Sequence, residues 1–460
     1  MDNLPSCDAQ KRDNDVNSLI NKGLYYLKNN DFIAAIKLFA ELTHIDDENF
    51  TCWFYLGKAR LKNNQPEKAV KDFYKALKII PNNPDALISL GQAYESLNEK
   101  NKAKECYEKV IELQPENAEA YCQLGFYYSE TNQHELAMEY FIMANQINPS
   151  DASTYINLGS SYDVLGYDEK AVEHYKTALD MNPEDSVAWY LLGTLYMDIV
   201  SKLSDKNDEI SAITENISKN KYFELAKTAF IKATSINPDY ISAYLNLGIL
   251  LFNEKIFSEA DFFLKKAIEC GQVCKTNNDF VDVSPEINYY LGLIAAENKC
   301  YQKAIEHFKL AIDGNYLNEE SYLNMAISFL QIDENKLAIE SLLVAFKLNN
   351  VNHEITYQLG FAYFLQAEYE RAIKYFNITI KIKPNYRDAH YFKAISLVRI
   401  GANEKAIKCF NLILNLNHSD HFALYQKGLI YLNKKERKKA MILMNRAREL
   451  GNKDAENFFI

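Results

Sequence analysis

The segment Pro84 to Asn117, PDALISLGQAYESLNEKNKAKECYEKVIELQPEN, contains two apolar stripes separated by a short polar stretch at 97–101. The first stripe comprises Leu87, Leu90, Ala93 and Tyr94, and the second comprises Ala103, Tyr107, Val110, Ile111 and Leu113. Intervals of mostly three and four residues place each stripe on one face of a helix. The segment therefore predicts two helices joined by a tight turn and packed through their apolar faces.

The same pattern recurs along the chain in one register. Nine of the eleven intervals between the following twelve alanines are 34 residues long: Ala35, Ala69, Ala103, Ala137, Ala171, Ala226, Ala260, Ala304, Ala338, Ala372, Ala406 and Ala440. A second small residue stands twelve positions before each of them: Gly23, Gly57, Gly91, Gly125, Gly159, Gly193, Gly248, Gly292, Ala326, Gly360, Ala394 and Gly428. Glycine inside a helix costs about 1 kcal/mol relative to alanine. Its recurrence at one place therefore predicts that the two helices approach each other closely there.

This repeat resembles that of the tetratricopeptide repeat family. The family's leucine–glycine pair is found in eight repeats, as in Leu90–Gly91, and its second-helix aromatic is found in nine, as in Tyr107. Lys393 and Lys427 depart from the pattern by replacing the leucine in the last two repeats. The resemblance covers roughly residues 16–454. It implies an all-α fold, an α-solenoid in which about twelve helix-turn-helix units form a right-handed superhelix.

Two insertions interrupt the predicted array. We expect a flexible N-terminal segment at 1–15, repeats one to five with the first helix of repeat six at 16–198, a polar insertion at 199–219, the rest of repeat six and repeat seven at 220–271, an inter-repeat insertion at 272–284, repeats eight to twelve at 285–454, and a C-terminal tail at 455–460. Each insertion is either a functional loop or a tolerated surface addition. The tail either folds back as a lid over the last repeat or leaves that end as a contact site.

Composition limits the classes of partner. The net charge of −11 argues against nucleic acid as the general partner. Residues 421–454 nevertheless carry nine Lys and Arg against three acids, a net charge of +6. This end is either a solvated face or a contact for RNA or anionic lipid. No apolar run approaches the ~20 residues of a membrane span, and residues 1–15 lack the apolar core of a signal peptide.

The eight cysteines form no C-x-x-C pair, which fits a reducing compartment and predicts a cytoplasmic or nuclear protein. Cys270 and Cys274 are four residues apart, but no His or Cys pair stands nearby at zinc spacing. The chain also lacks a Gly-rich phosphate loop and a Gly-x-Ser-x-Gly motif. His418-Ser419-Asp420-His421 falls in a turn, where capping accounts for its Ser and Asp. We therefore expect a non-enzymatic protein without catalytic residues, cofactor or metal.

In the family, first helices line a concave groove, and the residue two positions before the small residue points into it. Seven of the twelve equivalent positions hold amides: Asn21, Gln123, Asn157, Asn246, Asn324, Gln358 and Gln426. An amide donates and accepts hydrogen bonds, so a row of them holds a peptide backbone without reading its side chains. The row resembles the amide ladder in the helical arm of O-linked GlcNAc transferases. The alternative is that these amides are ordinary polar surface.

Aromatic residues gather at the predicted groove in repeats ten to twelve, and such rings are typical anchors of protein interfaces. They are Tyr357, Phe361, Phe364, Tyr391, Phe392 and Tyr425. Acids occur near the start of the same helices at Asp85, Glu119, Glu286, Glu320, Glu354 and Asp388. They either favour the helix dipole or select a ligand whose basic residues flank apolar ones.

The preferred hypothesis is a scaffold or adaptor that binds a peptide or protein segment in the groove. Binding of heat-shock chaperone C-terminal tails is argued against, because the positions that hold basic residues in carboxylate-clamping relatives hold residues such as Cys122, Leu191 and Glu354. One alternative is a chaperone or secretion cochaperone, which would suppress client aggregation. Another is a targeting subunit of a sugar transferase or ubiquitin ligase, which would co-purify with a catalytic partner. The oligomeric state is left open.

Overall fold

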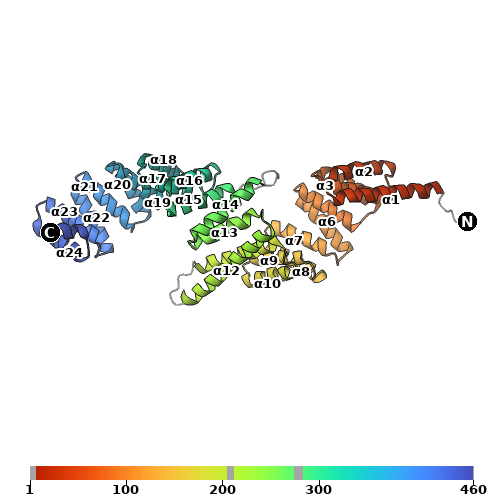
Figure 1. Cartoon of the computed structure of the whole chain (residues 1–460), viewed down its shortest axis with the longest axis horizontal. Helices are drawn as coiled ribbons and strands as arrows, with labels where there is room; N and C mark the ends of the chain where they lie inside the picture. The colour runs from red at the N-terminus through yellow and green to blue at the C-terminus, as the bar shows by residue number, and fades with distance from the viewer. Residues whose placement is uncertain (1–6, 205–211, 274–282, 459–460) are drawn as a thin grey trace. The chain divides into compact units, whose positions relative to one another are not determined.

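The computed structural model describes residues 7–204, 212–273 and 283–458. Within them the chain consists of helices that pack in successive pairs, with no strand (Figure 1). Two compact units are formed, Met1–Ile236 and Asn237–Ile460. These observations confirm the predicted all-α solenoid of helix-turn-helix units.

The first unit contains six pairs. Their bounds are α1 Cys7–Lys28 and α2 Phe32–Ile45, α3 Phe50–Lys62 and α4 Pro66–Ile79, α5 Pro84–Ser96 and α6 Lys100–Leu113, α7 Ala118–Glu130 and α8 His134–Ile147, α9 Ala152–Val164 and α10 Asp168–Met181, and α11 Ser186–Ser204 and α12 Ala212–Ile236. Helix α1 starts at Cys7, within the segment 1–15 that we expected to be a flexible lead-in.

The second unit contains six further pairs and a terminal helix. Their bounds are α13 Ile241–Asn253 and α14 Phe257–Val273, α15 Ser284–Glu297 and α16 Tyr301–Asp313, α17 Asn318–Gln331 and α18 Asn335–Leu348, α19 His353–Leu365 and α20 Tyr369–Ile382, α21 Arg387–Arg399 and α22 Asn403–Leu416, α23 His421–Asn433 and α24 Arg437–Glu449, and α25 Lys453–Phe458.

The insertions expected at 199–219 and 272–284 lengthen helices. Helix α11 continues to Ser204, and α12 begins at Ala212, so most of the first insertion is helical. Helix α14 likewise extends to Val273, and α15 begins at Ser284. Residues 205–211 and 274–282, which include Cys274, lie outside the described residues.

The recurring small residues lie where the two helices of a pair meet. A Cβ built on Gly125 would lie 2.6 Å from the ring of Phe141, and one built on Gly360 would lie 2.6 Å from the ring of Phe376. Both rings are almost fully buried. The glycine on the first helix therefore accommodates the aromatic ring of the second helix, which is the close packing that the sequence predicts.

The ends of the first helices are set by local hydrogen bonds. At the start of α5, the side chain of Asn83 accepts a hydrogen bond from the amide of Ala86, and Asn117 and Asp151 cap α7 and α9 in the same way. At the end of α7, Asn132 adopts a left-handed φ of 58°, and the amide of Gln133 bonds to the carbonyl of Tyr128. This arrangement is a Schellman-type C-terminal cap, and it turns the chain into the second helix.

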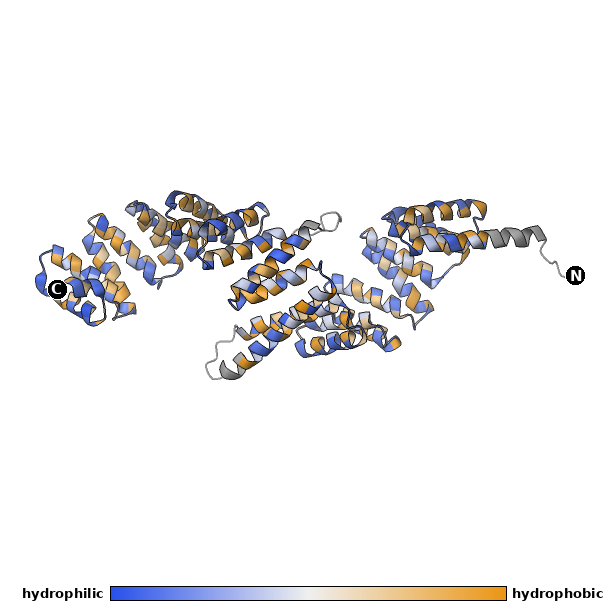
Figure 2. Ribbon diagram, in the orientation of Figure 1, coloured by the Kyte–Doolittle hydropathy of each residue, from blue (hydrophilic) through white to orange (hydrophobic). Residues whose placement is uncertain are grey.

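Apolar residues concentrate on the helix faces that meet one another (Figure 2). At the C-terminus, α25 covers part of the last pair, with Ala455 buried against Leu424 and Ala447. Asn452 caps α25 by accepting from the amide of Ala455, and its own amide group donates to the carbonyl of His421. The short helix α25 thus covers part of the last pair, which is the position expected of a terminal lid.

Candidate protein-binding surface

The predicted amide ladder lies on the first helices of the pairs. Gln123 on α7, Asn157 on α9, Asn246 on α13, Asn324 on α17 and Gln358 on α19 are all half-buried. Asn21 on α1 is exposed. These amides therefore occupy the same position on the first helix of their repeats, but they are not all buried to the same extent.

Internal hydrogen bonds engage some of these amides. Asn324 donates to the hydroxyl of Tyr289 at 3.4 Å, and Gln358 donates to Glu354 at 2.8 Å. The side chains of Gln123 and Asn157 make no hydrogen bond within the described part of the chain. A peptide backbone would thus meet unengaged amides in the first unit and would have to displace internal partners in the second.

The aromatic residues predicted at repeats ten and eleven form one cluster around Phe392. Its ring centroid lies 5.0 Å from that of Phe361 and 5.4 Å from those of Phe364 and Tyr391. Tyr357 stacks on Phe361 at 6.2 Å. These residues come from α19 and α21, whose packing brings them together, and all five are half-buried. We call Tyr357, Phe361, Phe364, Tyr391 and Phe392 the aromatic cluster.

Tyr425, the sixth aromatic predicted for this surface, packs elsewhere. It lies on α23 against Leu424, Ala447 and Ala455. It thus contacts the cluster that α25 completes, and within the described residues its ring does not contact those of Phe392 or Tyr391. The predicted aromatic stretch is therefore split between a cluster on α19 and α21 and a separate contact at the C-terminal lid.

The structure adds Tyr386 to the surroundings of the aromatic cluster. Its ring centroid lies 5.1 Å from that of Tyr357, and its hydroxyl donates to Glu354 at 3.2 Å. Burial and the nearby carboxylate of Glu354 raise the pKa of Tyr386 to about 12. Tyr386 precedes its helix, so the groove register used to select candidates does not include it. Its place in the turn before α21 gives no sequence signal that it reaches α19.

Three of the six first-turn acids are engaged inside the chain. Glu286 accepts from the hydroxyl of Tyr316, Glu354 accepts from Tyr386 and Gln358, and Asp388 pairs with Arg387 at 2.7 Å. Glu286 and Glu354 thus connect elements 30 or more residues apart in sequence. These contacts favour a structural role for this half of the acidic row.

Arg387 connects the aromatic cluster to the next repeat. It forms an ion pair with Asp420 at 2.9 Å, and its guanidinium lies 4.6 Å from the ring centroid of Tyr391. Asp420 also caps α23 by accepting from the amide of Ala423. Burial opposes ionisation of Asp420, but the hydrogen bonds from Arg387 and from this amide hold its pKa below the ordinary value. The polar cluster at residues 418–421 therefore has the capping role expected of it.

Other features bear on alternative functions. In the described ranges, no three His, Cys, Asp or Glu side chains are grouped so that they could hold a metal ion. The thiol of Cys270 contacts the carbonyl oxygen of Pro238 at 3.4 Å. Across the same ranges, no helix combines the length and the apolar character needed to cross a bilayer.

Family models match the first unit. Residues 29–155 match the tetratricopeptide-repeat domain of cytochrome c-type biogenesis protein H, and residues 152–185 match the tetratricopeptide repeat itself. No curated protein matches the chain. The helix pair found in these residues recurs through the rest of the described chain. The chain is a tetratricopeptide-repeat protein, and such repeats are generally a protein-interaction fold.

Several solved structures are similar in part. Human IFIT1, solved as a dimer with PPP-AAAA, is 18% identical with a TM-score of 0.47, covering 81% of this chain and 85% of that chain. The Cut9–Hcn1 hetero-tetramer of APC/C contains a chain that is 14% identical with a TM-score of 0.42, covering 94% of this chain and 95% of that one. PilF of Pseudomonas aeruginosa is 18% identical with a TM-score of 0.41, covering 52% of this chain and 94% of that one. The family assignment rests on the two family models and the repeated helix pairs.

Proposed function

We propose that this protein is a non-enzymatic scaffold or adaptor that binds a peptide or protein segment across the first helices of repeats ten and eleven. The observation that supports this proposal best is the aromatic cluster. Five rings from α19 and α21 converge, yet each keeps part of its surface accessible. Aromatic side chains in such positions supply much of the affinity of protein interfaces.

The neighbouring polar groups support backbone contacts beside these rings. Gln358 lies next to Tyr357 on α19, and its amide is held by Glu354. Asn324 occupies the equivalent position on α17. A segment lying across α17, α19 and α21 would place apolar side chains on the rings and its backbone near these amides. Tetratricopeptide repeats are typically non-catalytic, which agrees with a binding role.

Selection of peptides from a random display library tests the proposal. We expect selected peptides to share apolar residues and to lose at least about tenfold in affinity for the variant Phe361→Ala, because one buried aromatic anchor contributes 1.4 kcal/mol or more. The matched control is Phe126→Ala, which removes a phenylalanine that is 42% exposed on α7. Peptides that bind both variants as well as the wild-type protein would contradict the proposal.

Two further experiments separate the alternative roles. A chaperone that shields unfolded clients would suppress client aggregation without selecting a shared motif. A targeting subunit would instead co-purify with a catalytic partner, and purification from cells followed by mass spectrometry would detect that partner.

A further inference from the structure

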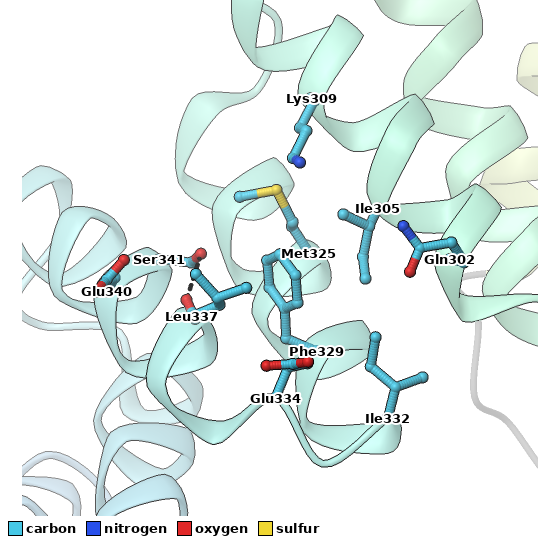
Figure 3. A pocket seen from close by; sticks show the side chains of 10 residues that line it. All are labelled: Gln302, Ile305, Lys309, Met325, Phe329, Ile332, Glu334, Leu337, Glu340 and Ser341. Carbon is cyan, nitrogen blue, oxygen red and sulfur yellow. Dashed lines mark hydrogen bonds between the residues drawn. The ribbon is translucent and has the colours of Figure 1, made fainter.

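A pocket of about 430 Å³ lies in the second unit where α16, α17 and α18 meet (Figure 3). Met325 and Phe329 come from α17, Ile305 comes from α16, and Leu337 and Ser341 come from α18. Phe329 stands among the other side chains, with Ile305 on one side and Leu337 on the other (Figure 3). This pocket is separate from the aromatic cluster, which α19 and α21 form.

Three other repeats carry a stacked pair of rings at the place equivalent to this pocket. The first-helix ring precedes its second-helix partner by twelve residues in each repeat, and the pairs are Tyr128–Tyr140, Tyr162–His174 and Tyr363–Tyr375. Their centroids lie 5.1, 5.1 and 5.5 Å apart, with interplanar angles of 18°, 4° and 7°. In these three repeats, a ring of the first helix therefore stacks on a ring of the second helix at the same two positions of the repeat.

Repeat nine has the first ring and lacks the second. Phe329 aligns with Tyr363, and Ser341 aligns with Tyr375, one 34-residue period earlier. The hydroxyl of Ser341 turns back to donate to the carbonyl of Leu337 at 2.8 Å, so it does not reach Phe329. The pocket therefore lies beside Phe329, at the register position where repeats four, five and ten carry a second ring. A cavity of about 150 Å³ suffices to bind benzene, so this one has room for an aromatic side chain.

Two other repeats that lack the aromatic pair show a different side-chain contact at these positions. In repeat two, Arg60 and Asp72 occupy the two positions and form an ion pair at 2.6 Å. In repeat three, Cys106 replaces the second ring, and the hydroxyl of Tyr94 instead bonds to that of Tyr74 at 2.7 Å. In repeat nine, within the described residues, Phe329 makes no ring contact and Ser341 forms no ion pair.

The rim of the pocket is charged. Glu334 and Glu340 lie at the α18 side and Lys309 lies on α16. None of the three forms an ion pair within the described ranges. Two carboxylates against one ammonium give the rim a net negative charge, which favours a cation on whatever enters the pocket.

We propose that this pocket binds an aromatic side chain of a partner protein segment in which a lysine or arginine stands next to the aromatic residue. The aromatic ring completes the stack on Phe329 at the separation seen in the other repeats, and the adjacent cation lies near Glu334 and Glu340. Offset stacking of this kind adds affinity beyond the burial of area.

Small probes test both parts of the proposal in the full chain. The methyl resonance of Met325 is the reporter, assigned by its disappearance in Met325→Leu. We expect p-cresol, the side-chain analogue of tyrosine, to shift this resonance, and cyclohexanemethanol to shift it much less. Tyramine, which adds an ammonium group, should bind about threefold more tightly than p-cresol, as an exposed ion pair allows. The double variant Glu334→Gln with Glu340→Gln should remove that difference.

Variants of Ser341 identify the site of binding. Ser341→Tyr supplies the missing ring and should abolish the p-cresol response, whereas Ser341→Ala leaves the pocket open and should retain it. If Ser341→Tyr does not fold, Leu337→Trp covers the pocket from its exposed rim and should have the same effect. A Met325 resonance that p-cresol does not move, an equal response to cyclohexanemethanol, or an undiminished response in the filled variants would overturn the proposal.

Sedimentation velocity determines whether the occupant is a separate partner. The wild-type protein and Ser341→Tyr should sediment identically if the aromatic residue belongs to another protein. A wild-type dimer that Ser341→Tyr abolishes would assign the pocket to a second copy of this chain and contradict the proposal as stated.

Discussion

Repeats three to five and repeats ten to twelve share an interior but present different surfaces. In both regions a first-helix glycine faces a buried second-helix side chain, as in Gly125 with Phe141 and Gly360 with Phe376. Residues 84–185 carry 19 Asp and Glu against six Lys, a net charge of −13. Residues 352–454 carry 18 Lys and Arg against nine Asp and Glu, a net charge of +9. The interior positions therefore fix the fold, and the surface positions vary independently of it.

The first helices of the two regions differ in the same way. The position two before the small residue holds Ser89, Gln123 and Asn157 in the first region, and it holds Gln358, Phe392 and Gln426 in the second. Phe392 is the centre of the aromatic cluster, whereas Asn157 makes no side-chain hydrogen bond within the described chain. The second region therefore presents aromatic rings on the helices of the proposed binding surface.

The largest expected effect concerns the interior, where the two regions should behave alike. Gly125→Val and Gly360→Val each place a branched side chain where even a Cβ would lie 2.6 Å from a ring. Each should lower the free energy of unfolding of its unit by about 3 kcal/mol or more, because a tightly packed core tolerates added volume poorly. Urea denaturation measures this effect.

Alanine substitutions at the same two glycines provide a graded control. Ala394 already occupies this position opposite Phe410 in repeat eleven, so the helix pair accommodates a methyl group there. Gly360→Ala should therefore cost less than Gly360→Val. A glycine-to-valine variant as stable as the wild-type protein would show that the interior does not fix the fold in the way described.

The second effect should separate the two regions. Phe392→Ala should lower the free energy of unfolding by about 2 kcal/mol, less than the 3–5 kcal/mol of a fully buried phenylalanine, because Phe392 is half-buried. Asn157→Ala, at the equivalent position, should leave stability within about 0.5 kcal/mol of the wild-type value. Equal losses in the two variants, measured by urea denaturation, would remove the distinction between the surfaces.

The third effect depends on pH. Asp420 and Asp151 occupy the same capping register, but only Asp420 is paired with an arginine, Arg387. The pKa of Asp420 is lower when folded than when unfolded, so its ion pair stabilises the protein above the unfolded pKa of about 3.9 and is lost as pH falls through the folded value. Asp420→Asn keeps a capping acceptor and should cost about 1 kcal/mol at pH 7.

Thermal unfolding of Asp420→Asn and Asp151→Asn between pH 7 and pH 2 measures this effect. The deficit of Asp420→Asn should shrink toward zero at the acid end, whereas Asp151→Asn should differ little from the wild-type protein at pH 7. A deficit of Asp420→Asn that does not depend on pH would argue that the ion pair does not contribute.

The smallest effect concerns the charged surface of the first region. Lys100 pairs with Glu130 at 2.8 Å, but both side chains are at least 40% exposed. Lys100→Ala should change the free energy of unfolding by less than about 0.5 kcal/mol. A larger loss in urea denaturation would mean that the acidic region needs its ion pairs to fold.

The fold could be predicted from the sequence because its determinants are local and periodic. A small residue and a large second-helix residue, such as Gly360 and Phe376, recur in a fixed order with a period of mostly 34 residues, and this recurrence predicts that they are in contact. Residues such as Asn132 and Gly166 mark the turns. Periodicity also placed Phe361 and Phe392 on the first helices of successive repeats, α19 and α21. The sequence therefore suffices to select all five residues of the aromatic cluster.

The remaining features depend on contacts that periodicity does not encode. Tyr386 lies in a turn and reaches α19 only through the packing of successive repeats. The tyrosine partners of Glu286 and Glu354 lie 30 or more residues away, at positions with no common register. Tyr425 keeps its register but packs against a cluster to which Ala455 of α25 contributes. The pocket beside Phe329 arises from one small residue, Ser341, whose consequence appears only when the stacked rings of other repeats are seen.

Hydrogen–deuterium exchange with and without a peptide selected from the display library tests the central claim most directly. Binding at the aromatic cluster predicts slower exchange in α19 and α21, with no change in α7 and α9 of the acidic region. Protection confined to α7 and α9, or a peptide that binds without protecting α19 and α21, would contradict the assignment of the binding surface to repeats ten and eleven.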